Sequence, residues 1–278
     1  MIRLLFITVL VWATDHYDLA DAHCDLIEDK VKWERITYGS KSSMIAVNSQ
    51  NDALWIITTK SHEITDGYYI AKFNNATKRW DVDESQPVGA SGSYYNSITV
   101  DPQGNPAFLD TSRHIHRKKN GWWMKMEGCA KRITFGGDGS FFKADCKGYV
   151  FKYDEDVDSW DPIGHRKSFS IAVDDQGVPW IVSNPKKVFR WDDELKRWSE
   201  MGVDKAYFVA AGKSDQVYVI AEPRRDDDHT VYRYLSRRWV KLPGKTAEEI
   251  AVGPDGRIFI TVDDNKIFES KTFGEKWD

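Results

Sequence analysis

The chain contains 278 residues, of which 41% are hydrophobic and 29% charged, a composition typical of a water-soluble globular protein rather than a disordered or collagen-like one. Its formal net charge is −4, so it lacks the basic excess that neutralises phosphates, and we expect no nucleic-acid partner. Aromatic residues make up 13% of the chain and include 12 Trp. So many Trp residues suggest one structural position that recurs along the chain.

The N-terminal segment predicts secretion. An apolar run from Leu4 to Ala13 is too short to cross a bilayer, and a basic residue precedes it. We interpret residues 1–13 as a signal peptide and residues 14–31 as an N-terminal segment, with a later cut after Ala22 as a second candidate. The alternative interpretation is a buried N-terminal strand. We expect a secreted, extracellular protein without a transmembrane segment.

Cysteine usage and a glycosylation sequon bear on the same question. Three cysteines are too few for a disulfide-built scaffold, so a hydrophobic core must hold the fold together. If two of them pair, the odd thiol is free or joins two chains into an oligomer, and Cys24 is the candidate. Asn75 begins an Asn-Ala-Thr sequon, which makes it a candidate N-glycosylation site and the protein a candidate glycoprotein.

An internal repeat predicts the fold. A Trp recurs about every 40 residues. Between successive Trp residues the same order recurs: an apolar alternating run, a polar turn, a run with a central aromatic residue, and a third run that usually ends in a basic residue. The six central aromatic residues are Trp55, Phe108, Phe142, Trp180, Tyr218 and Phe259. The seven Trp residues that bound six repeats are Trp33, Trp80, Trp123, Trp160, Trp198, Trp239 and Trp277.

The fourth repeat shows the pattern most clearly. Residues 170–173 alternate as a short strand, Gly177 stands in the turn, Trp180 is the central aromatic residue, and residues 188–190 end the third run. Gly suits the turn because tight hairpins require a positive φ. Each repeat therefore predicts a four-stranded sheet too small to bury both of its faces alone. Radial packing of such sheets is the β-propeller solution.

The two ends of the chain predict how the ring closes. The last repeat stops at Trp277, whereas a complete copy of the corresponding strand lies at residues 32–36. We predict an all-β, six-bladed β-propeller of four-stranded antiparallel blades over residues 32–278, closed by the N-terminal strand joining the last blade. The repeated Trp residues have two interpretations, packing between blades or sugar-stacking platforms, and their regular spacing favours packing.

This combination of features resembles the tectonin family of β-propeller lectins, which includes tachylectin-like and fish-egg-lectin-like proteins. The resemblance extends from Trp33 to Trp277. It implies a secreted, carbohydrate-binding protein of innate defence that binds microbial glycans or lipopolysaccharide without catalysis or a cofactor. The segment after the Trp keeps the family's Pro-Gly at Pro243 and Gly244, whereas the first two repeats have drifted. The repeat is also similar to that of NHL and gluconolactonase-type propellers, some of which are enzymes.

One face of the predicted propeller is the expected ligand face. It carries the loops from each fourth strand to the next first strand and from each second strand to the third. Tyr94, Tyr95, Asn96 and Tyr207 fall there, and such rings can stack on sugars while an amide binds hydroxyl groups. Loop aromatics that merely cover the blades are the alternative. Matching positions in other blades hold Lys131-Arg132 and Glu248-Glu249, so we expect one or a few distinct pockets rather than six equal ones.

Further candidates are charged or sulfur-containing. Arg224 and Arg225 lie in an acidic and basic insertion that could bind phosphate or sulfate, or could be a solvated loop. Cys129 and Cys146 fall in two loops of one blade, so a disulfide across the ligand face is one interpretation and two separate buried thiols the other. Asn75 would carry its glycan on the opposite face.

Signals for a metal site or catalysis are weak. His114 and His116 project from one strand face, but two nitrogens without a third ligand do not define a metal site. We find no nucleophile elbow, zinc-protease motif or phosphate loop, and we predict no enzyme. The first functional hypothesis is a secreted lectin. The alternative is a structural or protein-binding propeller in an extracellular or larger assembly, and the third is a propeller hydrolase or lactonase.

Overall fold

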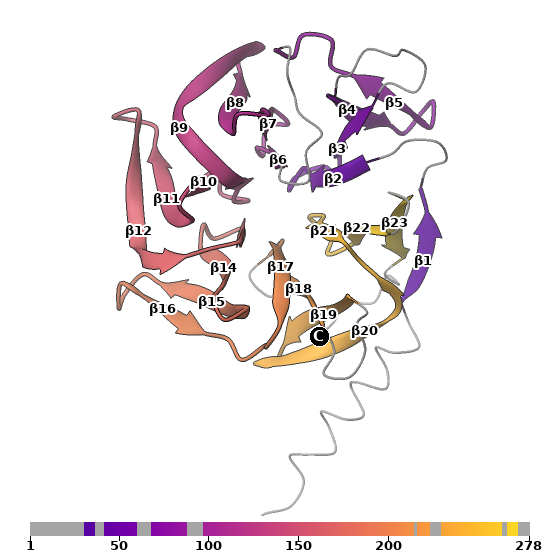
Figure 1. Cartoon of the computed structure of the whole chain (residues 1–278). Helices are drawn as coiled ribbons and strands as arrows, with labels where there is room; N and C mark the ends of the chain where they lie inside the picture. The colour runs from indigo at the N-terminus through magenta and orange to yellow at the C-terminus, as the bar shows by residue number, and fades with distance from the viewer. Residues whose placement is uncertain are drawn as a thin grey trace, which may run out of the picture.

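The computed structural model describes residues 31–36, 42–59, 68–87, 97–213, 216–222, 229–262 and 266–271. Throughout these ranges the regular elements are β-strands, which form antiparallel sheets arranged radially around a central space (Figure 1). No helix capable of spanning a bilayer occurs in the ranges described. The predicted signal peptide, Cys24 and Trp277 lie outside them. The chain is a β-propeller.

The strands follow the repeat along the chain. A first sheet contains β2 (Ser42–Val47), β3 (Leu54–Thr59), β4 (Tyr68–Asn74) and β5 (Arg79–Val82). A seven-stranded sheet contains β6 (Ile98–Val100), β7 (Pro106–Leu109), β8 (His114–Lys119), β9 (Trp122–Phe135), β10 (Phe141–Asp145), β11 (Tyr149–Asp154) and β12 (Ser159–Lys167). The next two sheets contain β13 (Ser170–Val173), β14 (Pro179–Ser183), β15 (Lys187–Asp192) and β16 (Arg197–Glu200), then β17 (Ala206–Ala211), β18 (Val217–Ala221), β19 (Thr230–Leu235) and β20 (Arg238–Thr246). The last sheet contains β21 (Glu249–Val252), β22 (Ile258–Val262), β23 (Lys266–Lys271) and β1 (Lys32–Arg35).

The long strand β9 belongs to two groups of strands. Its first half pairs with β8, from Trp122 to Cys129, and its second half pairs with β10, from Ala130 to Phe135. One continuous strand therefore runs from the outer edge of one group of four to the inner edge of the next.

The N-terminal strand β1 lies at the outer edge of the last sheet. It pairs antiparallel with β23, with Trp33 opposite Ser270. The Ile36 amide donates to the Ile267 carbonyl oxygen at 3.1 Å, which extends the same ladder. The first and last described strands of the chain therefore share one sheet.

Cross-strand pairs explain the repeated sequence pattern. The basic residue of the third strand lies directly opposite the central aromatic residue of the second, where its cation approaches the ring. The distances from cation to ring centroid are 5.8 Å for Lys72 and Trp55, 5.7 Å for Lys152 and Phe142, 5.6 Å for Arg190 and Trp180, and 5.9 Å for Arg233 and Tyr218. The pattern thus reflects contacts within each sheet.

The second group of strands departs from this pattern. In the other groups the central aromatic residue of the second strand lies between a first-strand residue and the basic residue of the third strand. Here the corresponding residues are Thr99 and Arg117, and Ala107, not Phe108, lies opposite both of them. Phe108 is one residue further along and so faces the other side of the sheet, where it packs with Trp55 of the preceding sheet. Its predicted equivalence to the other central aromatic residues was wrong by one residue.

The repeated Trp residues pack at the outer strands. Trp80, Trp160, Trp198 and Trp239 each contact an aromatic ring directly opposite on the third strand, at centroid distances of 5.0 to 5.1 Å. Two indoles also reach the preceding sheet: Trp33 Nε1 donates to the Pro243 carbonyl oxygen at 3.0 Å, and Trp239 Nε1 donates to that of Met201 at 2.7 Å. Together with Trp123, these Trp residues are half-buried, so they join outer strands instead of lining the centre.

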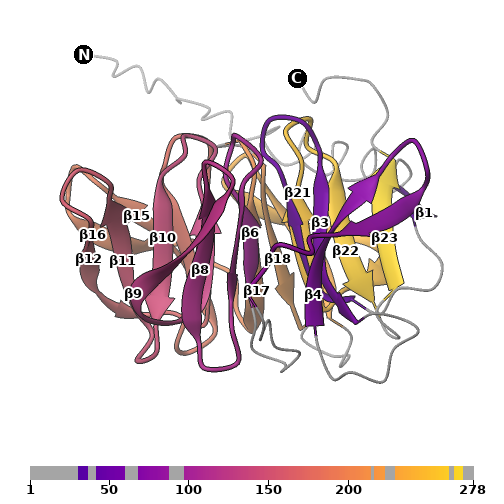
Figure 2. The same cartoon turned by 90° about the horizontal axis from the view of Figure 1, so that it is seen from above.

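The strands run between two faces of the molecule (Figure 2). The turn face carries the turns between first and second strands, such as 48–53 and 136–140, and between third and fourth strands, such as 155–158 and 193–196. The linker face carries the turns between second and third strands and the links between sheets, such as 146–148 and 201–205. The hydrophobic core lies between neighbouring sheets, in clusters that each combine residues from adjacent sheets.

Candidate functional site

A cavity of about 370 Å³ lies at the centre of the molecule. Its lining comes from the inner strands β2, β6, β9, β13, β17 and β21 and from the turns that follow them. A cavity of this size falls in the range of small-ligand pockets. Every group of strands contributes to it, so its chemistry depends on how the repeats differ from one another.

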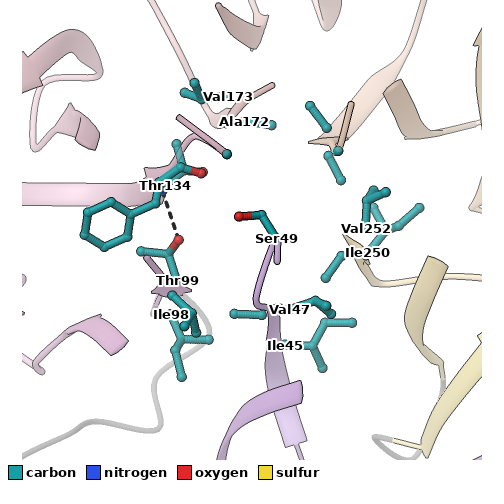
Figure 3. A pocket seen from close by; sticks show the side chains of 18 of the residues that line it. Ile45, Val47, Ser49, Ile98, Thr99, Thr134, Ala172, Val173, Ile250 and Val252 are labelled. Carbon is teal, nitrogen blue, oxygen red and sulfur yellow. Dashed lines mark hydrogen bonds between the residues drawn. The ribbon is translucent and has the colours of Figure 1, made fainter. Parts of the chain in front are cut away.

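The cavity wall is mixed, with apolar and polar surface in nearly equal parts. Ile45, Val47, Ile98, Ile250 and Val252 surround the space in Figure 3. The Ser49 hydroxyl also points into it, and this buried oxygen has no hydrogen-bond partner. An aliphatic chain would contact these apolar side chains, with polar groups beside them.

Hydroxyl groups satisfy the free edges of the inner strands. Ser97 Oγ accepts from the Ile133 amide at 3.2 Å, and Thr99 Oγ1 accepts from the Phe135 amide at 3.0 Å, a bond drawn in Figure 3. Ser170 Oγ accepts from the Val209 amide at 3.1 Å. An inner strand pairs with a second strand on one edge only, so the amides on its other edge need such acceptors. These hydroxyls therefore join neighbouring sheets.

Six equivalent residues form a layer at the linker-face end of the cavity. Each occupies the same register position at the start of an inner strand, opposite the end of the second strand. We name this set the first-position layer. It consists of Met44, Ser97, Arg132, Ser170, Phe208 and Glu249, of which all but Ser170 line the cavity.

Arg132 is the centre of this layer. Its Nη1 donates to Glu249 Oε1 at 3.1 Å and approaches Met44 Sδ at 3.7 Å, and its guanidinium lies 5.1 Å from the centroid of the Phe208 ring. Its strand β9 packs beside β6 and β13, whereas β21, which carries Glu249, packs beside β2 and β17. The ion pair therefore spans the cavity.

Burial dominates the electrostatics of this pair. The Glu249 side chain is only 8% exposed and that of Arg132 19%. Desolvation raises the pKa of Glu249 to about 7, although the Arg132 charge and hydrogen bond act in the opposite direction, and the neighbouring Glu248 raises it further. The neutral carboxylic acid is therefore accessible near neutral pH.

The turn-face end of the cavity is more accessible. Gln50 and Lys213 line the cavity there and are exposed, and Asp175 and Pro254 beside them are partly exposed. By contrast, Met44 and Glu249 at the other end are buried. Among the described residues, the cavity is thus reached from the turn face.

Large apolar side chains are exposed on the same turn face. Trp122 is 79% exposed, Val157 67% and Leu195 58%. They lie in or beside the turns between third and fourth strands in three successive groups of strands. Phe169, which is 46% exposed, lies on the linker face.

Most predicted ligand contacts fall outside the described residues: Tyr94, Tyr95, Asn96, Arg224 and Arg225. Tyr207 is described and lies on the linker face, half-buried. Lys186 Nζ donates to its hydroxyl at 2.6 Å, and the His229 ring lies 4.9 Å from its own ring. The structure therefore brings Tyr207 together with two residues that sequence reasoning did not pair with it.

Of the two interpretations of Cys129 and Cys146, a disulfide or two separate thiols, the structure has the disulfide. Cys129 lies in β9 and Cys146 in the turn between β10 and β11, with a Cα–Cα distance of 5.6 Å. Asn75 is exposed in the turn between β4 and β5, on the turn face.

The two neighbouring histidines share one carboxylate. Asp110 Oδ2 lies 3.0 Å from His114 Nδ1 and 3.0 Å from His116 Nε2. These hydrogen bonds outweigh the effect of burial and lower the pKa of Asp110. Within the described ranges no group of three or more His, Cys, Asp or Glu side chains is arranged to hold a metal ion.

Comparisons with known proteins agree with the fold. No family model matches the chain, and no curated protein matches it. Among solved structures, a structure described as YCF48 bound to D1 peptide has a TM-score of 0.54 and 10% identity, with 88% of this chain and 84% of that chain covered. The RRP9 WD40 repeats have a TM-score of 0.56 and 11% identity, with 87% and 97% covered. At this identity the likeness concerns the β-propeller fold.

Proposed function

We propose that this chain is a secreted, non-catalytic, six-bladed propeller scaffold that binds a protein partner through its turn face. Counting the two halves of β9 separately gives six groups of four strands, with β1 as the outer strand of the last group. This count supports a ring closed by the N-terminal strand. The disulfide fits an oxidising compartment, as the proposed secretion requires.

The observation that carries the proposal is the set of exposed apolar side chains on one face. Trp122, Val157 and Leu195 recur at corresponding turns of three successive blades. Scattered apolar residues need no explanation, but exposed apolar side chains that recur at corresponding turns of one face favour a protein interface, where Trp is an enriched anchor. We name these three side chains the apolar turn set.

The structural neighbours favour the same hypothesis. YCF48 has a similar fold, and its solved structure is described as bound to D1 peptide. Neither neighbour is described as a lectin, so glycan binding, the first hypothesis from the sequence, gains no support from them. The predicted glycan at Asn75 would share the turn face with the apolar turn set but lie in a different blade, leaving the blades from β8 to β16 for the partner.

The test is partner capture with matched variants. The tagged mature protein is incubated with extracellular medium of the source cells, and a captured protein is purified and titrated against wild type. The triple variant Trp122→Ser, Val157→Asp, Leu195→Asp should bind at least about tenfold more weakly, since a few anchors dominate interfaces.

Phe169→Asp is the control, because it removes an exposed apolar group from the linker face. It should bind as wild type does. Equal binding by the triple variant, or loss only with Phe169→Asp, would contradict the proposal. So would binding to a coherent set of sugars on a glycan array that no protein partner displaces.

A further inference from the structure

The first-position layer contains a charge pair where apolar residues would suffice. At equivalent positions Met44 and Phe208 fill the layer with apolar side chains. A buried ion pair is a poor stabilising device, because the cost of desolvating both charges offsets their attraction. The Arg132–Glu249 pair therefore points to a ligand that carries charge.

The two groups differ in whether a change of protonation can neutralise them. Glu249 can become neutral near pH 7 by taking up a proton, whereas a guanidinium stays charged at all ordinary pH values. An anionic ligand could take Glu249's place on Arg132 while Glu249 becomes a neutral acid. A cationic ligand paired with Glu249 would instead leave the Arg132 charge buried without its carboxylate. The pair thus selects for an anion.

The shape and wall of the cavity define the rest of the ligand. Arg132 lies at the buried end, and the path from the turn face passes the apolar side chains of Ile45, Ile98 and Ile250. Inner strands rise ~3.3 Å per residue, so the four residues from the first-position layer to the turn span about 10 Å. A carboxylate attached to a flexible aliphatic chain matches this arrangement, and Arg is well suited to bind it in bidentate fashion.

We propose that the central cavity binds a small aliphatic monocarboxylate, with its carboxylate on Arg132 and its chain along the apolar side chains of the wall. On binding, the ligand carboxylate replaces that of Glu249 as the partner of Arg132, and Glu249 takes one proton from the buffer acid. An O–H bond forms on Glu249 and the proton's bond to the buffer acid breaks; no other covalent bond changes, and the charge inside the cavity is conserved. This site does not depend on the protein partner proposed above.

Among the described residues, two charged groups act on Glu249. Arg132 approaches it from β9 and Glu248 precedes it on the chain. The neighbouring inner strands β17 and β2 present Phe208 and Met44 in the same layer. Proton uptake on binding is therefore assigned to Glu249.

Calorimetric titration with octanoate, decanoate and the alcohols octanol and decanol tests the proposal. Octanoate should bind at least about tenfold more tightly than octanol, because a charge-assisted hydrogen bond contributes more than a neutral one. Decanoate should exceed octanoate by roughly an order of magnitude, at about fourfold per methylene. At about pH 8 the binding enthalpy should depend on the buffer in the sense of proton uptake, and this dependence should fall at about pH 5.5.

Variants test which group takes up the proton and which group binds the carboxylate. Glu249→Gln should keep octanoate binding and lose the proton uptake. The double variant Arg132→Met, Glu249→Gln removes both charges together, which avoids an unpaired buried charge, and should bind octanoate and octanol alike. Ser112→Ala changes an exposed hydroxyl outside the cavity, in the turn after β7, and should leave the ratio of acid to alcohol affinity unchanged.

Three results would overturn the proposal. One is no binding of any acid by protein whose melting curve is normal. Another is equal affinity for acid and alcohol in the wild type. The third is an unchanged preference for the acid in the double variant.

Discussion

Arg132 and Glu249 occupy the same position in two different sheets, and their side chains meet across the central cavity, with Nη1 3.1 Å from Oε1. They are 117 residues apart in sequence. One member of the pair is a buried carboxylate whose pKa is raised, so the pair makes both the cavity and the fold sensitive to pH.

The stability of the protein should fall as pH rises through the range that Glu249 controls. Its pKa is raised from 4.5 to about 7, so the folded state binds more protons than the unfolded state between these values. The resulting loss between about pH 5 and about pH 8 is at most about 3 kcal/mol. Urea unfolding at these two pH values measures it.

Glu249→Gln is the control for this dependence, since the amide cannot ionise. Its stability should change less between the same two pH values than that of the wild type. Asp83, Asp110 and Glu155 have lowered pKa values, so their contributions are lost only at more acidic pH and do not obscure the window. Parallel pH profiles for the wild type and the variant would contradict the assignment.

A glycine in an outer strand accommodates a repeated Trp. A Cβ added at Gly164, which has φ +62°, would lie 2.8 Å from Trp198 Nε1 and 2.9 Å from a ring carbon of Trp191. Gly202 also has a positive φ, +80°, but nothing lies within 4 Å of its added Cβ. Gly164→Ala should therefore lose about 1–3 kcal/mol more than Gly202→Ala, which reports backbone strain alone.

Thermal unfolding of the two glycine variants makes the comparison directly. Equal losses would mean that the Trp contact at Gly164 adds nothing to the cost of the positive φ.

The hydroxyl bridges between inner strands should contribute measurably to stability. Ser170 is 1% exposed, and its hydroxyl accepts from the Val209 amide. Ser170→Ala leaves that amide without this acceptor and should cost about 1–3 kcal/mol. Ser112, which is exposed in the turn after β7, provides the control, and Ser112→Ala should change the unfolding midpoint little.

The disulfide should stabilise the fold by limiting the unfolded chain. Its cysteines are 17 residues apart, which corresponds to a loss of about 3 kcal/mol when the bond is removed. The double variant Cys129→Ser, Cys146→Ser should unfold at lower urea concentration than wild type, and reductant should have no further effect on it. Cys24→Ser is the matched control, and a loss of similar size there would contradict the account.

Much of the fold could be predicted because the repeat encodes local contacts. Alternating runs define strands, and the basic residue of the third strand faces the central aromatic residue by cross-strand register alone. Phe108 shows the limit of this reasoning. Ala107 occupies the repeated position instead, and a shift of one residue moves a side chain to the other face of the sheet.

The candidate site was harder to predict. The sequence indicated that matching positions hold Arg132 and Glu249, which differ in charge, but not that they touch. Their contact depends on the arrangement of all the sheets around one cavity. The apolar turn set was also missed, because a single Val or Leu in a turn carries no signal until the turns are seen on one face.

The most direct test of the central claim is hydrogen–deuterium exchange on the purified complex with the captured partner. We predict protection at the turns 120–122, 155–158 and 193–196, which carry Trp122, Val157 and Leu195, and little change at 146–148 and 184–186 on the linker face. Protection confined to the linker face would contradict binding through the turn face.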